Sequence, residues 1–78
     1  MAQDLRAFLA SRGISQDACG VLAGVDRSTV SLIVNGKTRA RPTTVVKLAR
    51  ALGVKATRMQ AMCEAHWLAA HPDEQVPA

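Results

Sequence analysis

The 78-residue sequence lacks tyrosine and contains one phenylalanine and one tryptophan, so aromatic side chains can contribute little to its core. It also lacks an apolar run near the roughly 18 residues that a membrane span needs. No basic segment followed by an apolar one opens the chain, which argues against a secretory signal. Strand-like alternation of apolar and polar residues is missing too. Because alanine and leucine favour helices, we expect an all-α domain. Because the membrane span and the secretory signal are both missing, we expect it to be cytoplasmic and to have no membrane partner.

Cysteine is scarce: Cys19 and Cys63 are the two in the chain, and they have no metal-binding spacing. We expect both to be small apolar core residues in a reducing compartment. A zinc site built from Cys63, His66 and His71 would lack a fourth ligand. We therefore expect no metal and no other cofactor.

Sets of catalytic residues are also absent from the sequence. There is no Ser-His-Asp set, no pair of carboxylates on one helix face and no glycine-rich phosphate loop. The length allows a single domain with a small core, in which a catalytic pocket is difficult to form. We place this domain at residues 1–71, followed by a flexible tail over residues 72–78, and we do not expect an enzyme.

Acidic residues are missing from one long segment, residues 27–58, of a chain whose net charge is +4. The same segment contains eight basic residues: Arg27, Lys37, Arg39, Arg41, Lys47, Arg50, Lys55 and Arg58. A segment of one charge sign attracts a polyanion such as DNA. A solvated basic surface without a partner is the alternative, and charge alone does not exclude it.

Apolar spacing and helix-breaking residues predict five helices, over residues 4–12, 16–23, 27–35, 42–52 and 56–70. Ser15 and Asp26 are candidate N-caps of the second and third helices. Pro42 suits the first turn of the fourth helix, where its missing N–H costs nothing.

The turn between the second and third helices depends on two glycines. Gly24 is predicted to adopt a positive φ, and Gly20 to let these helices approach closely, because it has no side chain. Cys19 and Leu22 are predicted to point from the second helix into the core. Two short, capped helices joined by such a turn form a helix-turn-helix, whose second helix can enter the major groove of DNA.

The segment GISQDACGVLAGVDRSTVSLIVNGK, followed by KLARALGV, resembles the phage-repressor or Cro-like helix-turn-helix family, also called the xenobiotic-response-element type. The resemblance covers roughly residues 5–60. It implies a five-helix, lambda-repressor-like domain with an extended fifth helix. It also implies a sequence-specific regulator of transcription, a repressor, that binds double-stranded DNA and reads its major groove with the helix over residues 27–35.

The resemblance also implies roles for individual residues. Arg27 could form two hydrogen bonds to guanine O6 and N7, and Leu32 could contact a thymine methyl group. The residues implied to face the bases are Arg27, Ser28, Ser31 and Leu32. The residues implied to contact phosphates are Gln16, Thr29, Asn35, Lys37, Arg39 and Arg41.

Structural roles at these positions are alternatives that the sequence leaves open. Arg27 could contact only a phosphate at the helix start, and Asn35 could simply end the helix. The other positions could hold capping, solvated or ordinary loop side chains: Ser28, Thr29, Ser31, Lys37 and Arg39.

The sequence departs from the family at Leu9 and Val34. Members often have an arginine and a glutamate that pair at these positions, and here both are apolar. Exchanging a buried ion pair for packed apolar residues is often neutral or stabilising, whereas removing one partner is costly. We therefore predict that Leu9 packs on Val34.

The predicted fifth helix has an apolar stripe made of Met59, Met62, Cys63, His66, Trp67 and Ala70. We expect its C-terminal part to reach beyond the core and to form the interface of a homodimer through Met62, Cys63, His66 and Trp67. Such a dimer would place two recognition helices about 34 Å apart on a palindromic operator. Two alternatives remain open: the helix completes the core of the monomer, or it binds a protein partner such as a toxin, as in an antitoxin or adaptor.

Overall fold

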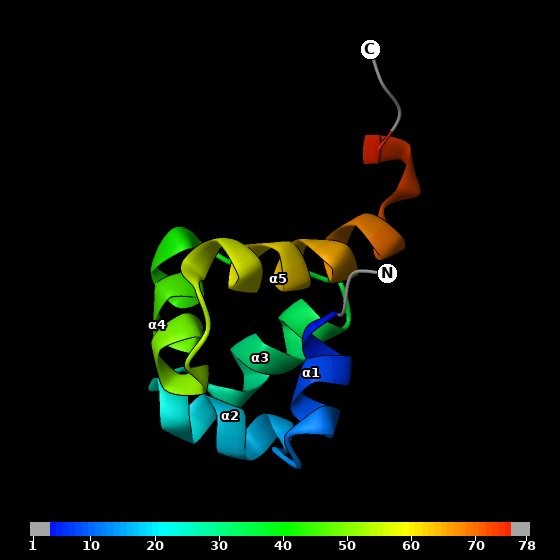
Figure 1. Ribbon diagram of the computed structural model, residues 1–78. Helices are drawn as coiled ribbons and strands as arrows, with labels where there is room; N and C mark the ends of the chain where they lie inside the picture. Colours follow the sequence, from blue (N-terminus) through cyan, green and yellow to red (C-terminus); the bar gives the residue numbers. More distant parts are fainter. Residues whose placement is uncertain (1–3, 76–78) are drawn as a thin grey trace.

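The computed structural model describes the backbone of residues 4–75 and the side chains through Asp73. This range contains five α-helices, one short 3₁₀-helix and no strand. The elements are α1 (Leu5–Ser11), α2 (Gln16–Ala23), α3 (Arg27–Val34), α4 (Pro42–Leu52), α5 (Ala56–Ala70) and η1 (Pro72–Gln75) (Figure 1). The predicted all-α, five-helix fold is confirmed. In this range no helix has the length and apolar character to cross a membrane.

The helices begin where polar side chains or proline favour a start. Asp4 Oδ1 accepts a hydrogen bond of 2.8 Å from the Ala7 amide, and Ser15 Oγ accepts one of 3.0 Å from the Ala18 amide. The predicted Ser15 cap is thus confirmed. Asp26 stands at the N-cap position of α3, as predicted, but its side chain accepts no hydrogen bond from the first amides of the helix. The prediction that the Asp26 side chain caps α3 is therefore wrong. The charge of Asp26 still interacts favourably with the positive end of the helix dipole.

Two glycines with positive φ end the helices that flank the main turn. Gly24 ends α2 with φ +69°, as predicted, and Gly36 follows α3 with φ +68°. The Gly36 amide donates to the Ile33 carbonyl at 3.0 Å, and the Lys37 amide donates to the Leu32 carbonyl at 2.9 Å. This pair of backbone bonds is a Schellman motif, which satisfies the last carbonyls of a helix.

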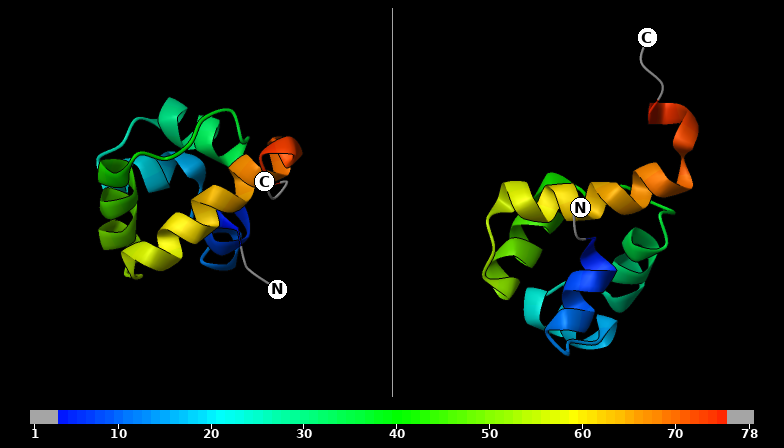
Figure 2. Two further views of the ribbon diagram at one scale, coloured as in Figure 1. Left: turned by 90° about the horizontal axis from the view of Figure 1, so that it is seen from above. Right: turned by 45° about the vertical axis from the view of Figure 1, so that its right-hand side comes forward.

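The core lies between all five helices, with α5 as its cover. Helix α2 packs on α3 and α4, while α5 packs on α4, α3 and α1. In Figures 1 and 2, α5 crosses the other helices, and its C-terminal end projects past them toward η1. The buried apolar residues are Leu5, Phe8, Leu9, Cys19, Val30, Ile33, Val34, Val45, Leu48, Ala49, Leu52, Met59, Met62 and Cys63.

The inward face of α2 differs from the prediction. Leu22 is 59% exposed, whereas Cys19 and Gly20 are buried and Ala23 packs against the core. At 3.6 residues per turn, Leu22 lies roughly 100° around the helix from the centre of this small-residue face. The prediction that Leu22 points inward is therefore wrong, because α2 packs through its smallest side chains.

The chain does not become irregular at Pro72. The predicted tail begins there, but Pro72–Gln75 form the 3₁₀-helix η1, which packs against the end of α5. The rest of the predicted tail, residues 76–78, lies outside the described residues.

Candidate nucleic-acid interface

Helices α2 and α3 meet closely at Gly20. A Cβ atom at this position would lie 2.6 Å from the Val25 carbonyl oxygen and 3.5 Å from the Arg27 amide nitrogen. Both neighbours are backbone atoms, which cannot move aside like the end of a flexible side chain. The close approach predicted for Gly20 is therefore present, and it fixes how α3 leaves the turn.

Helix α3 has one buried face and one exposed face. Val30, Ile33 and Val34 are buried in the core. On the other side Arg27 and Ser28 are exposed, Leu32 is 43% exposed, and Ser31 is half-buried. The four residues predicted to face the bases thus lie largely outside the core, on an eight-residue helix that the turn at Gly24 sets at the surface.

Arg27 also has a neighbour within the protein. Its guanidinium lies 3.6 Å from a carboxylate oxygen of Asp17, and the two side chains are 74% and 65% exposed. Ion pairs this exposed contribute little to stability. The pair therefore does not hold Arg27 away from another anion.

Asn35 closes the end of α3 with its side chain. Its Nδ2 donates to the Ser31 carbonyl at 2.9 Å and to Ser31 Oγ at 3.3 Å, and its Oδ1 accepts from the Arg6 guanidinium at 3.2 Å. The helix-ending alternative for Asn35 is thus present in the structure. Contacts of Ser31 and Asn35 with DNA stay predictions.

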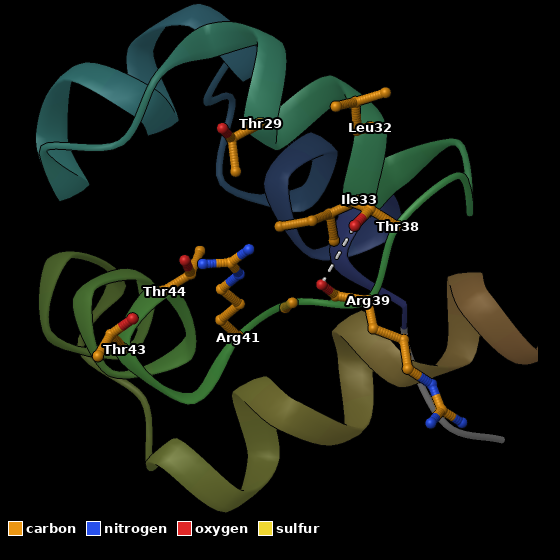
Figure 3. Close-up of a pocket in the computed structure, with 9 residues that line it drawn as sticks. Thr29, Leu32, Ile33, Thr38, Arg39, Arg41, Thr43 and Thr44 are labelled. Carbon is orange, nitrogen blue, oxygen red and sulfur yellow. Dashed lines mark hydrogen bonds between the residues drawn. The ribbon is translucent and has the colours of Figure 1, made fainter.

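A cavity of about 390 Å³ lies between α3, α4 and the loop that joins them (Figure 3). Its lining combines Thr29 and Leu32 of α3 with Thr38 and Arg41 of the loop. Figure 3 shows the Arg41 side chain pointing into the space between the two helices. Two further lining residues, Thr43 and Thr44, belong to the first turn of α4.

Sequence analysis missed these hydroxyl groups at the start of α4. Helix α4 has no side-chain N-cap hydrogen bond, its N-cap residue is Arg41, and Pro42 is its first residue. The first amides of a helix lack partners within the helix, and together with the helix dipole they favour an anion. Hydroxyl residues directly after Pro42 were the signal that could have identified this end of the cavity.

Arg39 contacts α5. Its guanidinium lies 2.9 Å from Glu64 Oε1 and 5.3 Å from the centre of the Trp67 ring, both on α5. Figure 3 shows the side chain pointing away from Arg41 and the cavity. The phosphate contact implied for Arg39 stays a prediction, because an ion pair between side chains that are 52% and 36% exposed is weak and can be exchanged for a phosphate.

The predicted interface on α5 needs correction for three of its four residues. Met62, Cys63 and His66 are only 2%, 4% and 9% exposed. They do not extend beyond the core, because α5 packs along α4, α3 and α1 and uses this stripe to cover them. Trp67, which is half-buried, stacks on His71 with 3.7 Å between ring centres. Met62, Cys63 and His66 therefore do not form an exposed surface for a second copy or for another protein.

The two cysteines, Cys19 and Cys63, are packed core residues. Cys19 and Cys63 are buried and free, and burial, with smaller contributions from Cys19 and Glu64, raises the pKa of Cys63 to about 11. A thiol with so high a pKa is a poor nucleophile near neutral pH. Among the side chains of residues 4–73, no group of three or more His, Cys, Asp or Glu could hold a metal ion.

His66 joins α5 to the start of α1. Its Nε2 accepts a hydrogen bond of 3.3 Å from the Arg6 amide and lies 3.9 Å from Asp4 Oδ1. Burial lowers the pKa of His66 from its ordinary 6.5; the Asp4 carboxylate opposes this shift and Arg6 reinforces it. His66 is therefore held in its neutral form, which alone can accept the amide proton.

This arrangement predicts a pH dependence of stability. The unfolded chain binds a proton at His66 more readily than the folded one, so the free energy of unfolding should fall as the pH drops below 6.5 and level off below the folded pKa. Urea unfolding of the wild type and of His66→Gln between about pH 7 and pH 5 measures this effect. A glutamine oxygen can still accept from Arg6 but does not titrate. Parallel pH curves for the two proteins would show that His66 is not responsible.

Comparison with known proteins adds one positive result. A family model described as Helix-turn-helix matches residues 5–58, which is more than half of the chain. The matched segment runs from α1 into the start of α5, so it includes the turn at Gly24, the exposed face of α3 and the cavity beside α4. No curated protein and no solved structure matches the chain.

Proposed function

Because this chain belongs to the Cro/C1-type helix-turn-helix family of DNA-binding transcription regulators, we propose that it is a repressor that reads the major groove with α3. The exposed face of α3 is the observation that carries the proposal. Arg27 and Ser28 stand at its start, Ser31 and Leu32 follow one turn later, and the opposite face is buried. A helix that enters the groove with its N-terminus first brings these side chains to the base edges.

The proposed base contacts follow from side-chain chemistry. Arg27 can donate two hydrogen bonds to guanine O6 and N7, which is a strongly discriminating contact. Ser28 and Ser31 can donate or accept, and Leu32 can contact a thymine methyl group. The ion pair with Asp17 is weak enough at this exposure for Arg27 to exchange it for a base.

The proposed phosphate contacts lie on both sides of α3. Gln16 stands at the N-terminus of α2, where backbone amides favour an anion. On the other side, Lys37 and Arg41 lie in the loop before α4, and Thr43 lies in its uncapped first turn. Two such contacts on opposite sides would fix the register of α3 in the groove without reading sequence. Thr29, which lines the cavity, Asn35 and Arg39 remain in the proposed set.

We propose a homodimer on a palindromic site. One eight-residue helix with four base-facing side chains reads few base pairs, and two helices one DNA turn apart multiply that discrimination. The two copies would meet through a surface other than the buried residues Met62, Cys63 and His66. Bound over a promoter, such a dimer would block polymerase, so transcription from a template carrying the selected site should fall as protein is added.

Selection from a randomised duplex pool, followed by affinity measurements at two salt concentrations, tests the proposal. We expect a short two-fold-symmetric motif and affinity that falls steeply with salt. Arg27→Ala should relax one base position in each half-site at a cost of about 1–3 kcal/mol.

Lys37→Ala is the matched control, because it removes a charge that we assign to phosphate. It should weaken binding to all sequences alike and reduce the salt slope by about one. If Arg27→Ala instead weakens every sequence equally, Arg27 contacts phosphate and not a base. A motif without two-fold symmetry would count against the dimer.

A further inference from the structure

The loop over residues 35–41, which joins α3 to α4, rests directly on the last turns of α5. A Cβ atom at Gly36 would lie 2.5 Å from the His66 carbonyl oxygen and 2.6 Å from Ala70 Cβ. The backbone of the loop and that of α5 therefore touch without an intervening side chain. On the α5 side, this contact is made by His66 and Ala70, which lie outside residues 5–58 that the family model matches.

A hydrogen bond from His71 reinforces this contact. His71 Nε2 lies 3.0 Å from the Gly36 carbonyl oxygen. Because a carbonyl can only accept, Nε2 must carry the proton in this bond. The imidazole is held by stacking on Trp67, with ring centres 3.7 Å apart and planes inclined by 21°.

Further contacts hold the loop to α5 and α1 and leave its basic residues exposed on the side where we propose DNA to bind. Arg39 anchors the loop to α5 through Glu64 and the Trp67 ring. Two residues further along, Arg41 points into the cavity between α3 and α4 (Figure 3). Arg6 of α1 adds a contact at the start of the loop, with Asn35. The loop is thus fixed from α5 and α1, while Lys37 and Arg41 stay exposed.

We propose that Trp67 and His71 are positioning residues for DNA binding: they hold the loop over residues 35–41 so that it meets phosphates, without contacting DNA themselves. This inference rests on the proposed function, in which Lys37 and Arg41 of the loop contact phosphates. A loop that is ordered before binding avoids the entropic cost of becoming ordered in the complex. Removal of the anchor should therefore lower affinity by about tenfold and leave base preference unchanged.

The test uses His71→Ala and Trp67→Ala in the full chain, with the DNA duplex selected by the wild type. Gln60→Ala is the matched control, since Gln60 is an exposed residue of the same helix, about two turns before Trp67. We expect both test variants to bind the selected duplex and its single-base variants about tenfold more weakly, with unchanged ratios between sequences. Gln60→Ala should bind like the wild type.

Amide hydrogen exchange in the free protein separates positioning from global stability. The Lys37 amide, which donates to the Leu32 carbonyl at 2.9 Å, should exchange faster in both variants, while amides in the buried turns of α4 keep wild-type protection. Trp67→Phe retains an aromatic ring beside His71 and should recover most of the affinity. This variant keeps the test decisive if Trp67→Ala does not fold.

Arg41→Ala and Lys37→Ala distinguish failure of the inference from failure of the proposed function. If they reduce affinity and the salt slope while His71→Ala and Trp67→Ala bind like the wild type, the inference is overturned and the phosphate contacts stand. If none of the four variants changes affinity, the loop does not meet DNA, and both the inference and the proposed phosphate contacts of Lys37 and Arg41 are overturned.

Discussion

Gly36→Ala should destabilise the protein by about 3 kcal/mol, which corresponds to a fall in Tm of roughly 15 °C for a domain of this size. Two effects add at this position. A side chain at φ +68° is strained by about 1–2 kcal/mol. The new Cβ would also lie 2.5 Å from the His66 carbonyl oxygen and 2.6 Å from Ala70 Cβ, so the loop or α5 must shift. Thermal and urea unfolding measure the loss.

Gly53→Ala is the matched control for this substitution. Gly53 has φ +69°, but a Cβ there would meet nothing within 4 Å. It should therefore show the backbone strain alone, about 1–2 kcal/mol. The difference between the two variants isolates the contact between the loop and α5, and equal losses would mean that the loop can move away from α5 at little cost.

Leu9→Arg and Val34→Glu, made separately, should each destabilise the protein by about 3–5 kcal/mol. Both side chains are 3% exposed and belong to the same core. Each substitution buries a charge without a partner, and such a charge costs far more than a lost apolar contact. Losses of this size approach the whole stability of a small domain, so urea unfolding should be measured at low temperature.

The double variant Leu9→Arg with Val34→Glu tests whether the two positions adjoin. If they do, the charges pair, and the double variant should be more stable than the sum of single losses predicts by about 1–3 kcal/mol. Leu9→Arg combined with Val30→Glu is the control, because Val30 is equally buried but lies one turn earlier on α3. Equal, additive losses in both combinations would refute the predicted packing of Leu9 on Val34.

The helices and the turn between α2 and α3 could be predicted because their signals are local. Ser15 caps α2 by accepting a hydrogen bond from an amide three residues further along the chain. Gly24 and Gly20 likewise act within a few residues of the turn that they shape. Stereochemistry alone restricts which residues fit such positions. The exposed face of α3 followed for the same reason, since apolar spacing on a short helix determines which side is buried.

The sequence did not indicate which surfaces meet. The α5 stripe was correctly identified as apolar, but a stripe does not specify whether it covers its own core or another chain. Arg39 and Arg41 are equivalent in sequence terms, yet one lies 2.9 Å from Glu64 and the other points into the cavity beside α3. Leu22 is exposed because the packing of α2 selected smaller side chains.

The sequence by itself determined the all-α architecture, the helix boundaries to within one residue, the glycine turn and the family. Each of these depends on interactions between residues a few positions apart. Only the tertiary structure decided that α5 covers the core, that the Gly36 backbone lies on His66 and Ala70, and that Arg39 and Arg41 point apart. Those outcomes depend on contacts between segments up to 60 residues apart, whose relative placement is set by the packing of all five helices together.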